Sequence, residues 1–401
     1  MPRSTDISRS LGSRGGCEVK NVKKTNAPIL RFTADNVTYS LWRAVKLGDI
    51  ATFINGRAYS QEELLSKGKY RVLRVGNFFT NDEWYYSDME LDQEKYAENG
   101  DLLYAWSATF GPKIWKENKV VFHYHIWKVV PQNDVLKNFL YVLLLVETEK
   151  LYKMVNGGTM MHITKGTMEN REVMIPSLPE QRKIGDFFIH LDRCIDLADK
   201  KLAALQNIKK GILQKIFSQE LRFKDDEGKE FPAWKENRLG NLCSTFKSGQ
   251  TITATQITEE GKYPVYGGNG LRGYTDTYTH AGAYVLIGRQ GALCGNVNYV
   301  QGKNYLSEHA IAVQANKDNS TEFLRYMLEQ MDLNRYSESS AQPGLSVKKL
   351  VRLKVMVPAN KVEQQKIAAY FTALDRAIAA AQQKAAALRT IKRGLLQKMF
   401  V

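Results

Sequence analysis

Two segments of the chain alternate apolar and polar positions in a way that predicts long helices. Their apolar residues recur at alternating steps of four and three, which is the spacing of a helix with one apolar stripe. Ser177 with Glu180, and Asn360 with Glu363, are helix-capping signals at the two starts. The stripe residues that we expect to pair the helices or dock other subunits are Ile184, Phe188, Leu191, Ile195 and Leu205, and Ile367, Phe371, Leu374, Ile378 and Leu388.

The two helical segments are copies of each other. Residues 180–217 align with residues 363–400 without a gap, and 21 of the 38 positions are identical. Each stripe needs an apolar partner, and the simplest one is the other copy in an antiparallel pair with a pseudo-twofold axis. The alternative is that each helix packs only on its own domain. Gly211 and Gly394 recur at the same register, which predicts close helix approach or a bend, because glycine is unfavourable inside a helix.

Short anchors outside the helices also repeat, whereas the sequence between the anchors does not. The repeated pairs are Leu30–Phe32 with Leu221–Phe223, Trp42 with Trp234, Leu47-Gly48 with Leu239-Gly240, and Val173–Pro176 with Val355–Pro358. We therefore interpret each half as a variable domain followed by a near-constant helix. A duplicated domain without any functional difference between its halves is the alternative.

The variable regions show the mixed pattern of an α/β (α+β) fold. Strands are predicted over residues 69–75, 119–127, 283–288 and 309–313, and helices over residues 135–153 and 321–336. Residues 1–26 are rich in Ser, Arg and Gly and predict a disordered basic lead. The expected organisation is this lead, a first variable domain over 27–176, a central helix over 177–217, a second variable domain over 218–359 and a C-terminal helix over 360–401.

The chain is basic, and the excess charge gathers on the predicted helices. Lys and Arg number 57 against 42 for Asp and Glu, a formal net charge of +15. Residues 180–217 and 363–401 together carry +8 of this charge. A polyanionic partner is the first expectation, although ribosomal and membrane-surface proteins share the signature. Four dispersed cysteines favour a reducing cytoplasm, and neither a secretory signal nor an apolar run long enough to span a bilayer is found.

The sequence lacks the motifs of an enzyme. Gly268, Gly270 and Gly273 fit a dinucleotide fingerprint, but no βαβ unit surrounds them. No phosphate-binding loop and no amino-methyltransferase loop occurs. His123 and His125 fall on one face of an expected strand, but no further residues complete a metal site. We therefore expect no catalytic residues and no bound metal in this chain.

Several polar loops are candidates for reading DNA bases. Arg can bind guanine through two hydrogen bonds, and Asn or Gln can bind adenine in the same way. In the first half the candidate residues are Trp106, Ser107, Thr109, Lys113, Asn156 and Thr159, and in the second half they are Tyr266, Asn269, Arg272, Tyr274, Arg289, Gln290 and Gln342. The alternative is that each of these loops is only part of the surface.

Taken together, these motifs closely resemble the specificity (S) subunits of type I restriction-modification enzymes. The Glu-Gln-x-Lys-Ile helices at Glu180 and Glu363, the entries at Leu47 and Leu239 and the loop over residues 264–270 carry the resemblance, which covers residues 27–401. It implies two target recognition domains, each of which reads one half of a split double-stranded DNA site. It also implies that the paired helices set the unread gap and dock two modification (methyltransferase) subunits. The Ser/Arg/Gly-rich start departs from the family.

The resemblance also implies which partners supply the chemistry of this host-defence system. The modification subunits would bring S-adenosylmethionine for DNA methylation, and restriction or motor subunits would bring ATP and Mg²⁺. The chain itself would bind no cofactor and would act in a bacterial or archaeal cytoplasm. Two other functions remain open at this point, namely a DNA-modifying enzyme with its own unrecognised catalytic site and a duplicated scaffold that binds only proteins.

Overall fold

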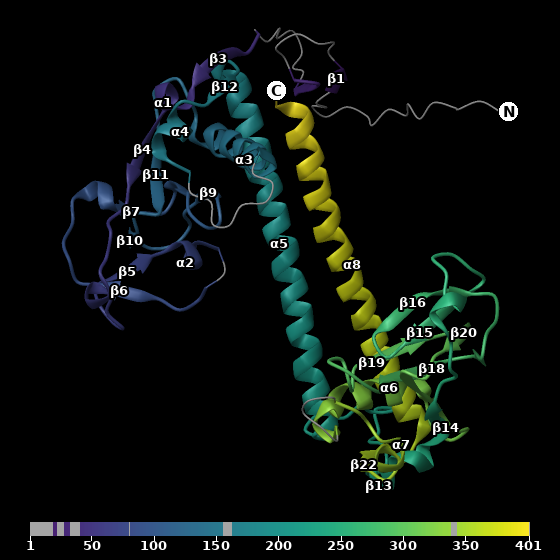
Figure 1. Cartoon of the computed structure of the whole chain (residues 1–401). Coiled ribbons are helices and arrows are strands. Elements are labelled where there is room, and N and C mark those ends of the chain that lie inside the picture. Colours follow the sequence, from purple (N-terminus) through teal and green to yellow (C-terminus); the bar gives the residue numbers. More distant parts are fainter. Residues whose placement is uncertain are drawn as a thin grey trace, which may run out of the picture. The chain divides into compact units, whose positions relative to one another are not determined.

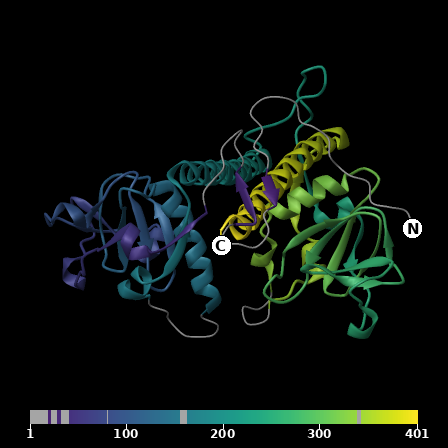
Figure 2. The same cartoon turned by 90° about the horizontal axis from the view of Figure 1, so that it is seen from above.

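The chain forms two compact units that exchange parts of two long helices. The computed structural model describes residues 19–21, 28–32, 41–79, 81–154, 163–337 and 343–400. One unit consists of Met1–Leu197 with Lys384–Val401, and the other of Ala198–Gln383. Helix α5 (Leu178–Phe217), drawn in teal, follows the blue domain of the first unit, and helix α8 (Lys361–Met399), in yellow, follows the green domain of the second (Figures 1 and 2).

The first unit contains two four-stranded sheets. The first sheet is antiparallel throughout and has the order β4 (Ala51–Asn55), β11 (Ile126–Pro131), β8 (Leu102–Ala105), β9 (Gly111–Ile114). The second has the order β6 (Tyr85–Ser87), β5 (Tyr70–Leu73), β10 (Val120–Phe122), β7 (Tyr96–Ala97), with β5 and β10 parallel. Its other elements are β1 (Val19–Asn21), β2 (Leu30–Phe32), β3 (Arg43–Lys46), β12 (Glu172–Ile175), α1 (Leu47–Ile50), α2 (Val75–Phe79), α3 (Lys137–Met154), α4 (Lys165–Glu169) and the 3-10 helices Gln61–Glu63 and Gln93–Lys95.

Strand β8 explains how this domain is layered. All four of its side chains are buried, and alternate side chains point to opposite faces of a strand. Leu102 and Tyr104 belong to the core that contains residues of α3, whereas Leu103 and Ala105 belong to the core shared with the second sheet. The first sheet therefore lies between the helix and the second sheet, and its central strands are apolar on both faces.

The second unit repeats this topology strand for strand. Its sheets have the orders β14 (Cys243–Ser248), β21 (Ala310–Ala315), β18 (Tyr284–Gly288), β19 (Val297–Val300), and β16 (Gly270–Thr275), β15 (Tyr263–Gly267), β20 (Lys303–Leu306), β17 (His280–Ala281). Strands β15 and β20 are the parallel pair here. The remaining elements are β13 (Lys235–Arg238), β22 (Lys354–Val357), α6 (Thr321–Gln330), α7 (Val347–Leu350) and the 3-10 helices Leu239–Leu242, Ala254–Gln256 and Leu333–Tyr336. The duplicated mixed α/β fold predicted from the sequence is confirmed.

Two local expectations are wrong, and one is narrowed. The strand predicted over 119–127 is two strands, because the chain turns at residues 123–125, where the Ile126 amide bonds the His123 carbonyl at 2.9 Å. The helix predicted over 321–336 ends at Gln330, because Asp332 adopts a left-handed backbone with φ 48°. Of the two alternatives for Gly211 and Gly394, a close helix approach is not found, since no described atom outside the helix's own neighbouring backbone lies within 4 Å of where a Cβ would stand, and a bend stays a prediction.

The repeated Glu-Gln pair holds each variable domain to the start of its helix. Glu180 is fully buried and accepts two hydrogen bonds from Arg31, of 2.9 and 2.5 Å. Gln181 donates to the carbonyls of Asp134 (3.1 Å) and Pro176 (3.0 Å) and accepts from the Leu136 amide (2.9 Å). The repeated anchors that contain Arg31 and Pro176 therefore recur because they form one buried junction between the domain and its helix.

The second junction repeats the first with one difference. Glu363, also fully buried, accepts from Arg222 at 2.9 Å and from the Trp234 indole at 3.1 Å. Gln364 bonds the Ser320 amide and the Pro358 carbonyl. The equivalent indole in the first unit, that of Trp42, is buried without a hydrogen-bond partner among the described residues.

Each unit contains a pair of antiparallel helix segments. In the first unit, Ile184 and Phe188 of α5 share a core with Leu396 and Met399 of α8. In the second, Ile367 and Phe371 of α8 share a core with Leu213 and Ile216 of α5. The other predicted stripe residues are partly exposed, and they are Leu191, Ile195, Leu205, Leu374, Ile378 and Leu388. The start of each stripe thus contacts both its own domain and the other helix.

Candidate nucleic-acid interface

Both variable domains form the same edge from four separate segments. In the first unit, the Arg57 amide bonds the Phe122 carbonyl at 2.9 Å, and the Trp106 amide bonds the His125 carbonyl at 3.1 Å. The Ile163 amide then bonds the Trp106 carbonyl at 3.2 Å. Four segments therefore meet here, namely those that follow β4, β8 and β10 and the one that precedes α4. We call the surface that they form the shared edge.

The second unit builds its shared edge with equivalent backbone bonds. The Gln250 amide bonds the Leu306 carbonyl at 2.8 Å, the Arg289 amide bonds the His309 carbonyl at 3.0 Å, and the Leu345 amide bonds the Arg289 carbonyl at 2.9 Å. Most of the side chains at equivalent places differ between the two edges, although His125 and His309 are the same residue. Arg57 and Gln250 occupy one equivalent place, and Trp106 and Arg289 occupy another.

One glycine in each unit is needed to form this edge. A Cβ at Gly56 would stand 2.2 Å from the Phe122 carbonyl oxygen, and one at Gly249 would stand 2.2 Å from the Leu306 carbonyl oxygen. Any larger residue would push apart the two segments that meet here. The variable residues that follow, Arg57 and Gln250, are therefore presented from a fixed bend.

In the second unit, the edge holds basic and amide side chains around a pocket. Arg289 and Gln290 line this pocket of about 490 Å³ together with Ser248, Ser346 and Lys348. The Arg289 guanidinium has no hydrogen bond or ion pair with any residue that the structure describes. It is therefore available to bind a partner from outside the chain.

The β15–β16 hairpin brings a second group of predicted residues to the same place. Gly268 and the exposed Asn269 form its turn, and a Cβ at Gly268 would stand 3.3 Å from the Arg289 amide nitrogen. The Arg272 side chain lies against Gly267 at the base of this turn, where a Cβ at Gly267 would stand 2.8 Å from Arg272 Cδ. The structure thus brings Asn269, Arg289 and Gln290 together. By contrast, Tyr266 packs on the core, and Tyr274 exchanges backbone bonds with Thr258.

In the first unit, the edge is aromatic and includes imidazoles. Trp106 stacks on Trp127 with 5.6 Å between ring centroids, and its indole donates to the Tyr124 carbonyl at 2.8 Å. The rings of Tyr124 and His125 lie 3.9 Å apart. Burial, with smaller contributions from nearby His125 and Arg74, lowers the pKa of His123 to about 4, so this ring is neutral at pH 7.

Two buried polar atoms beside this edge lack partners within the described part of the chain. They are the Tyr59 hydroxyl and the Arg74 Nε. Arg57 lies over the Tyr59 ring at 4.9 Å and forms an ion pair of 2.6 Å with Glu63. That partner lowers the pKa of Glu63 to about 2, so its carboxylate stays charged at neutral pH. The two unpartnered atoms are themselves buried, whereas the exposed Tyr124 and the half-buried Arg57 and His125 can reach bases or phosphates.

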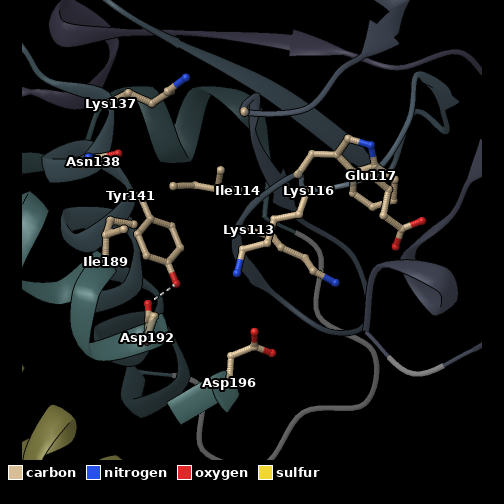
Figure 3. Close-up of a pocket in the computed structure, with 12 residues that line it drawn as sticks. Lys113, Ile114, Lys116, Glu117, Lys137, Asn138, Tyr141, Ile189, Asp192 and Asp196 are labelled. Atoms are coloured by element: carbon tan, nitrogen blue, oxygen red, sulfur yellow. Dashed lines mark hydrogen bonds between the residues drawn. The ribbon is translucent and has the colours of Figure 1, made fainter. Parts of the chain in front are cut away.

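The other predicted residues of the first half are dispersed. Ser107 is buried, whereas Thr109 is exposed. Lys113 donates to the Phe78 carbonyl at 2.8 Å. It lines a different pocket of about 530 Å³, between β9, α3 and α5, where Tyr141 bonds Asp192 (Figure 3). Asn156, Thr159 and Gln342 lie outside the described residues, as does most of the predicted basic lead.

Several residues of the two edges did not stand out in the sequence as candidates. They are Arg57, Tyr124 and His125 in the first unit, and Ser248 and His309 in the second, whereas Ser346 and Lys348 belong to the polar loop that follows the predicted Gln342. One signal was present in the sequence, because Gly56 and Gly249 follow the repeated Leu-Gly anchors at nearly equal spacing. The remaining residues come from segments that only the folded sheets bring together.

Across the described ranges, no group of three or more His, Cys, Asp or Glu side chains is placed to hold a metal ion. No helix in those ranges is long and apolar enough to cross a membrane.

Comparison with known proteins yields one family and several relatives. Residues 39–207 and 233–390 match the family model described as the type I restriction modification DNA specificity domain. The EcoprrI specificity subunit of Escherichia coli is 43% identical over 151 residues, which are 37% of this chain and 36% of that protein. The MjaVIII specificity subunit of Methanocaldococcus jannaschii is 24% identical over 230 residues, 55% of this chain and 53% of that protein. The chain thus spans about a third to a half of the length of these relatives.

One solved structure shares the fold over nearly the whole chain. The type I restriction-modification S subunit from M. genitalium superposes with a TM-score of 0.71 at 19% identity, and covers 94% of this chain and 99% of that one.

Proposed function

Because the chain belongs to the type I restriction-modification DNA specificity domain family, we propose that it is the DNA-specificity subunit of such a complex. In this proposal each variable domain reads one half of a bipartite site on double-stranded DNA. The long helices join the two readers and determine the number of unread base pairs between the half-sites. The chain would act in the cytoplasm, where it meets DNA.

One observation carries this proposal, namely that the two shared edges are built by equivalent backbone bonds but carry mostly different side chains. The place of Trp106 in one edge is the place of Arg289 in the other. A repeated scaffold with unlike polar and aromatic groups is suited to reading two different sequences. A duplicated enzyme would instead be expected to keep a set of reactive groups in at least one of its two copies.

The chemistry is assigned to partner subunits. Modification subunits would supply S-adenosylmethionine and methylate the DNA, and restriction subunits would supply ATP-dependent cleavage with Mg²⁺. We propose that two modification subunits bind one specificity chain, because the helix sequence that would dock them occurs twice. The specificity chain is then a non-catalytic subunit.

The test is methylome sequencing of cells that express the modification subunit with or without this chain. We expect methylation at one bipartite motif only when both proteins are present. The purified chain alone, incubated with S-adenosylmethionine and the same DNA, serves as the control for an intrinsic activity. Methylation by the chain alone, or an unchanged motif in its absence, would contradict the proposal.

A further inference from the structure

The first unit contains a cavity of about 530 Å³ between β9, α3 and α5, which we call the side pocket (Figure 3). Its lining includes Lys113, Ile114, Lys116, Lys137, Tyr141 and Ile189. All of its lining residues belong to the first unit, and none of them lies in the segments that form the shared edge. Small-molecule sites in proteins have volumes of about 300–1,000 Å³, so the side pocket is large enough to hold a ligand.

Two larger side chains close the strand side of the equivalent place in the second unit. The strand register makes Tyr299 of β19 the equivalent of Ile114 of β9. The Tyr299 hydroxyl donates to Glu322 of α6 at 2.7 Å, and the Arg325 guanidinium lies 5.6 Å from the centre of the Tyr299 ring. In the first unit the shorter Ile114 leaves the space between strand and helix open. The side pocket is therefore a difference between two domains that share one topology.

Three lysines bring positive charge to the side pocket. Lys116 and Lys137 form no hydrogen bond or ion pair with any residue in the described part of the chain. Lys113 donates to the Phe78 carbonyl at 2.8 Å and has no carboxylate partner among the described residues. Burial lowers the pKa of Lys113, and nearby Lys116 adds to this effect, whereas Glu117 opposes it. An anion between these ammonium groups would relieve their repulsion.

The carboxylates of the side pocket do not cancel this charge. Glu117 already pairs with Arg71 at 2.9 Å, and Asp192 pairs with Lys392 at 2.5 Å. Asp196 lies one turn further along α5, and both aspartates lie across the cavity from the lysines that follow the start of β9 (Figure 3). Carboxylate oxygens accept hydrogen bonds, so this side of the cavity suits the hydroxyl groups of a ligand.

The arrangement of these groups indicates the chemical class of the ligand. Ile114, Tyr141 and Ile189 form an apolar wall that suits a flat ring. The ammonium groups suit phosphate oxygens, and the aspartates suit sugar hydroxyls. A nucleotide carries all three kinds of group in one molecule of the right size. Inorganic phosphate would leave the apolar wall uncovered, and a nucleoside would leave the lysines unpaired.

We propose that the side pocket binds one nucleotide, with its base on the apolar wall and its phosphates among the lysines. The second unit has Asn298 and Thr321 at the places of Lys113 and Lys137, so the site belongs to the first unit. The inference goes beyond the proposed function, because it concerns a small molecule and shares no residue with the shared edge. A bound nucleotide would contact both β9 and α5 and would therefore stabilise the folded first unit.

Calorimetric titration of the full chain with adenosine triphosphate (ATP) tests the proposal. We expect one molecule of ATP bound per chain, and a rise in Tm of about 2–4 °C at ATP concentrations well above Kd. Adenosine and inorganic triphosphate, which each carry only part of the nucleotide, should each bind about tenfold more weakly or less. A chain that does not bind ATP, or that binds inorganic triphosphate as tightly as ATP, would overturn the proposal.

Variants of the lining locate the site. Ile114→Tyr should fold, because the second unit has a tyrosine at the equivalent place, and should lose ATP binding because the ring narrows the cavity. Lys116→Glu with Lys137→Glu should weaken ATP binding about tenfold or more and decides the question if the tyrosine variant is unstable. Lys67→Glu with Lys153→Glu is the matched control, since both lysines are exposed and lie outside the side pocket. ATP binding that survives both pocket variants would place the site elsewhere and contradict the inference.

DNA binding separates the side pocket from the shared edge. The double lysine variant of the side pocket should bind duplex DNA as tightly as the matched control and should direct methylation to the same motif. Loss of ATP binding with an unchanged motif supports the nucleotide site and leaves the proposed function as it stands. If the variant instead lost DNA affinity relative to the control, these lysines would hold DNA phosphates and the nucleotide inference would be wrong.

Discussion

Asp192 and Lys392 are 200 residues apart in sequence and form an ion pair in which Oδ1 and Nζ lie 2.5 Å apart. The Tyr141 hydroxyl donates to the other oxygen of Asp192 at 2.8 Å. The second unit repeats this arrangement, where Asp375 pairs with Lys209 at 2.7 Å and accepts from the Tyr326 hydroxyl at 2.9 Å. In each unit one aspartate thus joins the domain, the helix that follows it and the other long helix.

We predict that Lys392→Met destabilises the chain by about 1–3 kcal/mol, because it leaves a largely buried carboxylate without its cation. Denaturant unfolding measures this change. Lys398→Met is the control on the same helix, because Lys398 is exposed, and should change stability by less than about 0.5 kcal/mol. Adding Asp192→Asn to Lys392→Met should recover part of the loss. Strictly additive effects in this double-mutant cycle would show that the pair does not couple the helices.

A second prediction concerns Arg289. Arg289→Ala should relax recognition at one base pair of one half-site, because a two-point contact with a base contributes about 1–3 kcal/mol of discrimination. Methylome sequencing would then show a degenerate position in one half-site and an intact second half-site. Arg238→Ala, at an exposed position on β13, should leave both half-sites unchanged. Uniform weakening with a shallower dependence on salt would place Arg289 on a phosphate instead.

A third prediction concerns the independence of the two readers. Replacement of residues 42–176 by the first variable domain of another specificity subunit should change one half of the methylated motif and leave the other half unchanged. The reason is that each shared edge is complete within its own unit. The reciprocal exchange of residues 234–358 is the control and should change only the other half. A change in both halves after either exchange would show that the domains do not read independently.

A fourth prediction concerns the gap between the half-sites. Four residues inserted after Ala198 lengthen α5 by about 6 Å, which is under two base pairs of B-DNA. The same insertion after Ala381, the equivalent position of α8, should preserve both aspartate–lysine pairs. We expect the doubly extended chain to direct methylation of the same half-sites with a gap longer by one or two base pairs. An active variant with an unchanged gap would show that the helices do not set the spacing.

The register of the insertions has its own control. Two residues at the same places turn the apolar stripe by about 200° and should yield an unstable or inactive chain. Four residues at Ala198 alone should break one of the two aspartate–lysine pairs, because α8 then keeps its original length. Thermal unfolding of all three variants separates loss of stability from loss of activity.

The sequence was most informative where the same pattern occurred twice. Ile184 and Ile367, or Phe188 and Phe371, mark equivalent places in two copies, so helix ends and stripes could be predicted with little ambiguity. The turn at His123 was invisible, because apolar residues continue on both sides of it and β10 and β11 belong to different sheets. The apolar pattern fixes the type of an element but does not show where the chain passes between layers.

The candidate interface was only partly predictable for a related reason. Asn269, Arg289 and Gln290 stood out as polar residues in glycine-rich loops, and the structure brings them together. Arg57 did not stand out, because it joins the edge through a backbone bond to Phe122, which is far from it in sequence. Such long-range pairing has no local signal in one sequence.

The buried junctions have a consequence for how such chains can change over generations. The hydrogen bonds that Gln181 forms with its domain go to main-chain atoms, those of Asp134, Leu136 and Pro176, and so place no demand on the identity of those side chains. A foreign domain with the same backbone, and with an arginine in the place of Arg31 to pair with the buried Glu180, would therefore fit the junction without further compensating mutations. Genetic crossover within the segments that encode α5 and α8 could then replace a whole reader in one event, and a lineage could acquire a new DNA specificity faster than point mutation allows.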